Sequence, residues 1–99
     1  MADNASPAAT VRRNDSARRY ELEVDGHVAG FIDYRDSDGA RQLVHTEVDA
    51  AHEGKGYAAQ LAQHALDDVR DAGLKVVPAC SYVARYIDRH PAYTDLLVS

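Results

Sequence analysis

Two glycines set two residues apart mark the segment of this chain whose residue types suggest a definite chemistry. Gly54 and Gly56 follow an extended, β-branched run that ends near Val48, and an amphipathic pattern begins directly after them. Glycine permits the backbone conformations and the close approach that an anion-binding loop requires. The first turn of a helix adds unpaired N–H groups and the positive end of the helix dipole. The segment therefore predicts a backbone cradle for a diphosphate group.

Two common phosphate-binding motifs do not fit this loop. A dinucleotide-binding fingerprint needs a third glycine, where this chain has Ala59. A P-loop needs the string G-x-x-x-x-G-K-[ST], which does not occur in the chain. The predicted cradle must therefore serve another class of diphosphate ligand.

The segment Glu53–Ala58, with the sequence EGKGYA, resembles motif A of the GNAT superfamily of acyltransferases, [Q/R]-x-x-G-x-[G/A]. In that family the backbone amides of the motif hold the pyrophosphate of acetyl-coenzyme A. The opening position departs from the pattern, and we expect Glu53 to point away from the diphosphate while Lys55 supplies positive charge. The resemblance implies coenzyme-binding residues Val48, Glu53, Gly54, Lys55, Gly56, Tyr57 and Ala58.

Three further segments extend the resemblance to the very short, single-domain GNAT-like proteins. They are HTEV at 45–48, GLKVVPAC at 73–80 and YIDRHPAY at 86–93, and the likeness runs from about Arg18 to Leu97. It implies a small acyltransferase that uses acetyl-coenzyme A, without a metal, on an unidentified amine of a small molecule or protein. One alternative is an acyl-coenzyme A-binding module with little or no catalysis. Another is an interaction protein whose glycine loop is merely a turn.

Two residues of the extended run before the loop are candidates for proton transfer. His45 and Glu47 lie two apart, so both should project from one face of a strand. The family resemblance implies that Glu47 acts as the general base, directly or through water, and that amides around Val48 polarise the carbonyl group. The alternative is that His45 is an ordinary strand histidine and Glu47 a partner in an exposed ion pair.

Cys80 is the third catalytic candidate and the only cysteine of the chain. It should lie at the end of a buried strand, just before a helix whose N-terminus would lower the thiol pKa. In the resembled architecture this position is close to the acetyl group, so an acetyl-cysteine relay is one hypothesis. The alternative is a small, buried hydrophobic residue. Tyr82 and Tyr86, four apart on the following helix, could protonate the leaving thiolate or simply pack.

The elements that must position these residues follow from periodicity and turn signals. Alternation and the turns at 25–26 and 36–39 predict an antiparallel meander, and apolar residues at spacings of three and four predict a helix after the loop. A short apolar run after Gly73 predicts a buried strand parallel to the third one. Ser81 should cap a second helix, and 92–98 should form a last strand or pack. The predicted strands are 19–24, 27–34, 40–48 and 75–80, and the predicted helices are 57–72 and 82–89.

This order, β-β-β-α-β-α, is that of a minimal GNAT-like fold. The fold class is α+β, with a mixed, mainly antiparallel sheet and a diverging parallel strand pair. Larger family members carry two helices between their first and second strands, whereas only Asp25-Gly26 separates the corresponding segments here. One wall of the acceptor pocket should therefore be missing.

Composition bounds the remaining possibilities. The 99 residues carry a net charge of −5, and the acidic folded part argues against nucleic-acid binding. Residues 1–15 are predicted to be a disordered tail and residues 16–99 a single domain, with the early arginines solvated or touching an acidic partner. The absence of a signal-like or membrane-spanning run predicts a cytoplasmic protein, monomeric or weakly dimeric. No pair of histidines or cysteines has zinc-binding spacing.

Overall fold

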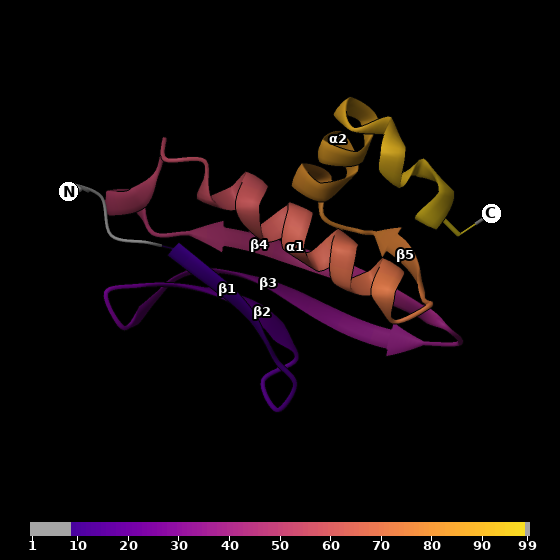
Figure 1. Cartoon of the computed structure of the whole chain (residues 1–99), viewed down its shortest axis with the longest axis horizontal. Helices are drawn as coiled ribbons and strands as arrows, with labels where there is room; N and C mark the ends of the chain where they lie inside the picture. The colour runs from indigo at the N-terminus through magenta and orange to yellow at the C-terminus, as the bar shows by residue number, and fades with distance from the viewer. Residues whose placement is uncertain (1–8, 99) are drawn as a thin grey trace.

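Residues 9–98, which a computed structural model describes, form one mixed sheet with its helices on one side (Figure 1). The predicted α+β class and the β-β-β-α-β-α order from residue 19 onward are confirmed. The elements are β1 (Ala9–Asn14), β2 (Arg19–Val24), β3 (His27–Ser37), β4 (Ala40–Val48), the 3₁₀-helix η1 (Ala50–His52), α1 (Tyr57–Asp71), β5 (Lys75–Pro78), α2 (Ser81–Arg89) and the 3₁₀-helix η2 (Pro91–Leu96).

The five strands lie side by side in chain order. The first three pairings are antiparallel, and β4 pairs with β5 in parallel, as predicted for a strand reached through a helical crossover. Short turns join β1, β2, β3 and β4, so no helix precedes η1 in residues 9–98. The sequence analysis expected this chain to lack the two helices that larger family members carry between their first and second strands. Residues 9–98 agree with that expectation.

The prediction of disorder over residues 1–15 is wrong for residues 9–14, which form β1; residues 1–8 lie outside the described part. Composition misled here because the segment is polar, yet Ala9 and Val11 pack against the core. Arg12 lies 3.1 Å from a carboxylate oxygen of Glu23 on the neighbouring strand. Arg12, Arg13 and Arg19 thus have acidic partners within their own chain.

The C-terminal part differs from the prediction in detail. Strand β5 ends at Pro78, two residues early, and Cys80 rather than Ser81 is the N-cap of α2. After α2 the chain forms η2, so the predicted alternative of packing, rather than a last strand, is confirmed: Leu96 is buried in the core and a single bridge joins Leu97 to Val76. Within residues 9–98 no helix combines the length and apolar character needed to cross a bilayer.

A bulge in β4 sets where β4 and β5 part. Tyr34 pairs with Leu43 and Asp33 with His45, so Val44 is an extra residue without a partner. Bulges bend a strand and increase its twist. The parallel pairing ends with Leu43 opposite Pro78, and the N–H of Cys80 donates the last bond, 2.9 Å long, to the Leu43 carbonyl. The predicted divergence of the parallel pair begins at this point.

The core lies between the sheet and the apolar face of α1. Leu61, Leu66 and Val69 on that face are fully buried. Gly30 of β3 allows the close approach, because a Cβ there would lie 3.0 Å from the Glu47 carbonyl oxygen and 3.3 Å from a methyl of Leu61. The N-terminal half of α1 is thereby seated directly on β3 and β4.

A buried guanidinium group closes the other end of this core. Arg41, only 6% exposed, binds both carboxylate oxygens of Asp36 at 2.7 and 2.8 Å. Its Nη1 donates to the Tyr20 hydroxyl at 2.8 Å, and that hydroxyl donates to Asp68 of α1 at 2.8 Å. The network satisfies the buried charge and ties α1 to β2 and β4.

The Asp36–Arg41 pair predicts a pH-dependent stability. Hydrogen bonds from Arg41 hold the pKa of Asp36 below its usual value, so the pair stabilises the fold above the unfolded-state pKa and loses this effect as pH falls. Asp36→Asn should lower the free energy of unfolding at pH 7 by about 1 kcal/mol, a modest amount because the carboxylate is half exposed. Urea denaturation should also show less loss of stability between about pH 5 and pH 3 in the variant.

Asp38→Asn is the matched control for this change. Asp38 lies in the adjacent turn, is exposed and accepts only a 3.4 Å bond from Ser37. Equal pH profiles for Asp36→Asn and the wild type would contradict the role of the ion pair.

Candidate functional site

The predicted cradle has the backbone geometry of an anion-binding loop. Gly54 and Gly56 have φ values of 85° and 77°, in the left-handed region that glycine adopts without strain. Gly56 is the N-cap of α1, and the N–H of Gln60 donates to its carbonyl at 3.0 Å. The N–H groups before Gln60, in the first turn of α1, have no carbonyl oxygen one turn earlier in the helix to which they could donate. They remain available to an anion in front of the helix.

A cavity of about 300 Å³ opens at this loop. Every predicted coenzyme-binding residue lines it except Lys55, which is exposed. Glu53 contributes to the wall, and whether its side chain points away from a bound diphosphate stays a prediction. The N–H groups at the start of α1 supply positive potential to this cavity. The lining residues are Thr46, Val48, His52, Glu53, Gly54, Gly56, Tyr57, Ala58, Ala59 and Tyr82.

The edge of β4 beyond the bulge faces this cavity without a strand partner in residues 9–98. The N–H of Asp49 donates to the Ala29 carbonyl on β3 at 2.8 Å. Successive amides of a strand point to alternate sides, so the N–H groups of Thr46 and Val48 point toward the side that β5 has left. Thr46 was missed by the sequence analysis, although its spacing of two from Val48 could have revealed it.

Cys80 lies against this free edge. Its Sγ is 3.3 Å from the Thr46 hydroxyl, although Cys80 does not itself line the cavity. Burial would raise the pKa of the Cys80 thiol, but hydrogen bonds from the Thr46 hydroxyl and from the amides of Val83 and Tyr82 outweigh it. The pKa of Cys80 is therefore lowered, which favours the thiolate.

His45 and Glu47 lie together on the opposite face of the sheet. His45 Nε2 is 3.1 Å from Glu47 Oε1, and both side chains are more than half exposed. Because Thr46 faces the cavity, its two neighbours must project from the other face. The structure thus pairs two of the three predicted catalytic residues and separates them from Cys80 by the thickness of β4.

A second cavity, of about 440 Å³, continues the first along α2. The two share Ala59 and Tyr82 as lining residues. Arg85 and Arg89 line the second cavity, and the stacked rings of Tyr86 and His90, with centroids 3.9 Å apart, form part of its wall. Sequence reasoning did not select these arginines, because only the packing of α2 beside α1 brings them to the loop.

The family to which the chain belongs follows from comparison with known proteins. A family model described as GCN5-related N-acetyl-transferase matches residues 19–96. The chain belongs to this family. The matched region contains the glycine loop, the free edge of β4 and Cys80. The resemblance noted in the sequence is confirmed.

Relatives in this acetyltransferase family include Protein NATD1 of several vertebrates. The Xenopus tropicalis protein is 32% identical over 94 residues, which cover 90% of this chain and 85% of that protein. The Gallus gallus protein is 43% identical over 49 residues, which cover 50% of this chain and 44% of that protein. The chain thus spans less than half the length of the chicken relative.

Solved acetyltransferase structures share the fold. A GCN5-like protein from Staphylococcus aureus has a TM-score of 0.69 at 18% identity, covering 91% of this chain and 88% of that one. A GNAT family acetyltransferase from Brucella melitensis, in complex with acetyl-CoA, has a TM-score of 0.57 at 24% identity. That match covers 73% of this chain and 54% of the Brucella chain.

The environment of Cys80 predicts enhanced reactivity. Alkylation of Cys80 by iodoacetamide should reach half its maximal rate at a pH below that of an ordinary thiol. Thr46→Val removes one hydrogen bond to the thiolate and should move the profile to higher pH. Mass spectrometry of the alkylated chain measures both profiles. Thr10→Val, on the exposed surface of β1, is the control, and identical profiles for Thr46→Val and the wild type would refute the assignment.

Proposed function

We propose that this chain is an N-acetyltransferase that binds the diphosphate of acetyl-CoA at the Glu53–Ala58 loop. The observation that carries the proposal is the opening of two left-handed glycines and the α1 N-terminus onto one cavity beside the end of β4. Family membership supports acetyl transfer, and the Brucella melitensis relative is known in complex with acetyl-CoA. Backbone N–H groups and the helix dipole are suited to a diphosphate.

The two ends of the coenzyme extend from this anchor in different directions. The acyl arm lies along the free edge of β4, where the amides of Thr46 and Val48 can pair with its amide groups in place of a strand. The nucleotide end enters the second cavity, where Arg85 and Arg89 offer positive charge to a phosphate. The continuity of the two cavities through shared lining residues supports this path.

Acetyl transfer is completed at the parted strands. The amine nitrogen attacks the thioester carbonyl carbon, a C–N bond forms, the C–S bond breaks and coenzyme A leaves as a thiolate. The Val48 N–H polarises the carbonyl oxygen. Because this amide lies in the plane of the sheet, the carbonyl carbon can be reached from the outer face. There the His45–Glu47 pair takes the proton that the amine loses.

A second route is favoured by the lowered pKa of Cys80. In that route the Cys80 thiolate attacks the thioester, forming acetyl-cysteine and releasing coenzyme A. The amine then attacks the acetyl-cysteine carbonyl carbon, a C–N bond forms and the C–S bond to Cys80 breaks; the amine proton passes to solvent and the Cys80 thiolate is restored. The two routes place the acceptor at the same parted strands but make different residues indispensable.

The acceptor approaches over the outer face of the sheet, which no helix covers in residues 9–98 (Figure 1). Such an open approach suits an amine carried on a small molecule or on a protein chain. The pocket wall that this face lacks could be completed by the acceptor itself or, in a weak dimer, by a second copy.

The glycine cradle is tested by a pair of matched substitutions. Gly56→Ala and Gly39→Ala both place a Cβ on backbone with φ near 78°, and neither Cβ would meet another atom within 4 Å. Each should cost about 1 kcal/mol of stability. Only Gly56→Ala should weaken binding of coenzyme A, by at least about tenfold. Isothermal titration calorimetry measures this, and equal affinities would place the diphosphate elsewhere.

The catalytic residues are tested by turnover of acetyl-CoA with a panel of amines, thiols and peptides. Direct transfer predicts that Glu47→Gln lowers kcat/KM about 10²-fold while Cys80→Ala retains activity. The relay predicts that Cys80→Ala abolishes transfer and that an acetylated Cys80 peptide appears in the wild type. Coenzyme binding without product from any acceptor would instead indicate a binding module.

A further inference from the structure

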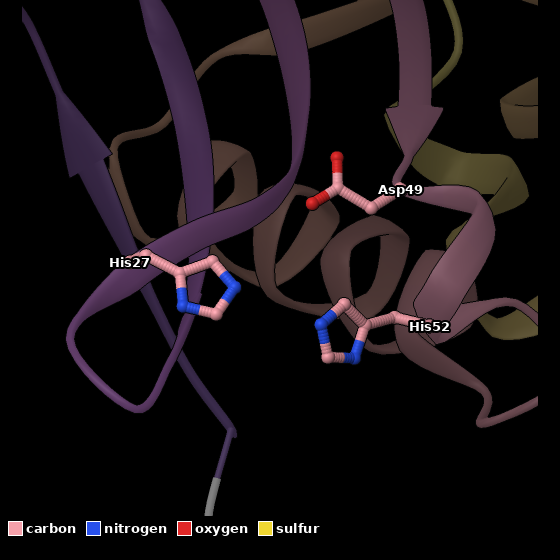
Figure 2. A group of neighbouring side chains, drawn as sticks. All are labelled: His27, Asp49 and His52. Carbon is pink, nitrogen blue, oxygen red and sulfur yellow. The ribbon is translucent and has the colours of Figure 1, made fainter.

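Three potential metal ligands meet beside the coenzyme loop, outside the groups used for acetyl transfer. They are His27 at the start of β3, Asp49 just after β4 and His52 at the end of η1. One donor atom from each lies within 4.8 Å of the other two. Figure 2 shows both imidazole rings and the carboxylate directed toward a common space between the β2–β3 turn and η1.

This donor set suits a divalent transition ion. Bonds of about 2.0–2.2 Å to histidine nitrogen and carboxylate oxygen put two ligands of a tetrahedral zinc ion roughly 3.4 Å apart. Donors within 4.8 Å of one another therefore need to close by up to about 0.8 Å each. The side chains of His27 and Asp49 are exposed and can rotate to make it. Two neutral imidazoles and one carboxylate favour zinc-like ions over calcium or magnesium.

Two observations make the cluster more than a chance meeting of surface residues. Asp49 is the N-cap of η1, yet its side chain makes no capping hydrogen bond. His52 Nδ1 is buried and is the one such side-chain nitrogen or oxygen in residues 9–98 without a hydrogen-bond partner. A buried polar atom without a partner is costly. A metal on the other ring nitrogen would fix the proton on Nδ1, where a bound phosphate could accept it.

In Figure 2 the ring nitrogen of His52 that faces His27 and Asp49 is Nε2, while Nδ1 points away from them. Coordination through Nε2 would leave the proton on Nδ1, free to be donated into the diphosphate cavity that His52 lines. The imidazole would thereby connect the ion to the wall of the coenzyme site.

We propose that His27, Asp49 and His52 form a binding site for a divalent transition ion of the zinc class. Three protein ligands leave a fourth position for water or another oxygen ligand. The ion would link the β2–β3 turn to η1 and so hold the segment that leads into the glycine loop. The proposal departs from the sequence prediction of no metal, which rested on local spacing and could not join residues 25 positions apart.

Zinc titration of the untagged, chelator-treated full chain tests the site without coenzyme. Calorimetry should detect one ZnCl₂ site in the wild type, and His27→Ala should weaken it by at least about tenfold. Asp49→Asn should weaken it as well, and circular dichroism checks that each variant is folded. His64→Ala removes an exposed histidine of α1 and should leave the affinity unchanged. Equal zinc affinity in the wild type and His27→Ala would overturn the proposal.

Coupling to the coenzyme loop is a separate measurement and rests on the proposed function. Zinc should raise the affinity for coenzyme A in the wild type but not in His27→Ala, because the ion fixes the approach to the loop. Zinc binding with no coenzyme binding under any condition would leave the metal site standing and refute the coenzyme site. Coenzyme binding with no zinc site would do the reverse.

Discussion

The parting of β4 from β5 is the constraint on which the site depends. The extra residue Val44 and the bond from Cys80 to the Leu43 carbonyl end the parallel pairing in the middle of β4. A strand edge without a neighbour is normally a liability, because its N–H and C=O groups attract other strands. Here the same edge supplies directed donors, and the adjacent helix start supplies more. A ligand with an extended amide arm and a diphosphate matches both sets.

The loop, its flanking strand and α1 were predictable because each carries a local signal. The two glycines require special backbone conformations, the alternation of β4 fixes which residues share a face, and α1 shows the spacing of a half-buried helix. The pairing of His45 with Glu47 followed from the same alternation. Local signals do not give the direction of side chains within the loop, so the sides assigned to Glu53 and Lys55 stay predictions.

The features that the sequence did not reveal are those made by residues distant in the chain. Strand β1 is polar by composition, and it is stable because its arginines meet acids on β2 and α1. Arg41 looks like a surface residue until the sheet places Asp36, Tyr20 and Asp68 around it. Arg85 and Arg89 line the second cavity only because of the way α2 packs. In each case the residue type is visible in the sequence, but its neighbours in space depend on how the strands and helices are arranged.

Gly30 of β3 determines how closely α1 approaches the strands beside the glycine loop. The space that a methyl group would occupy there is filled by a carbonyl of β4 and by Leu61 of α1. A side chain at that position would push α1 away from β3 and β4. The N–H groups at the start of α1 would then no longer lie level with the edge of β4. The absence of a side chain at Gly30 therefore sets how closely the first half of α1 approaches the edge of β4.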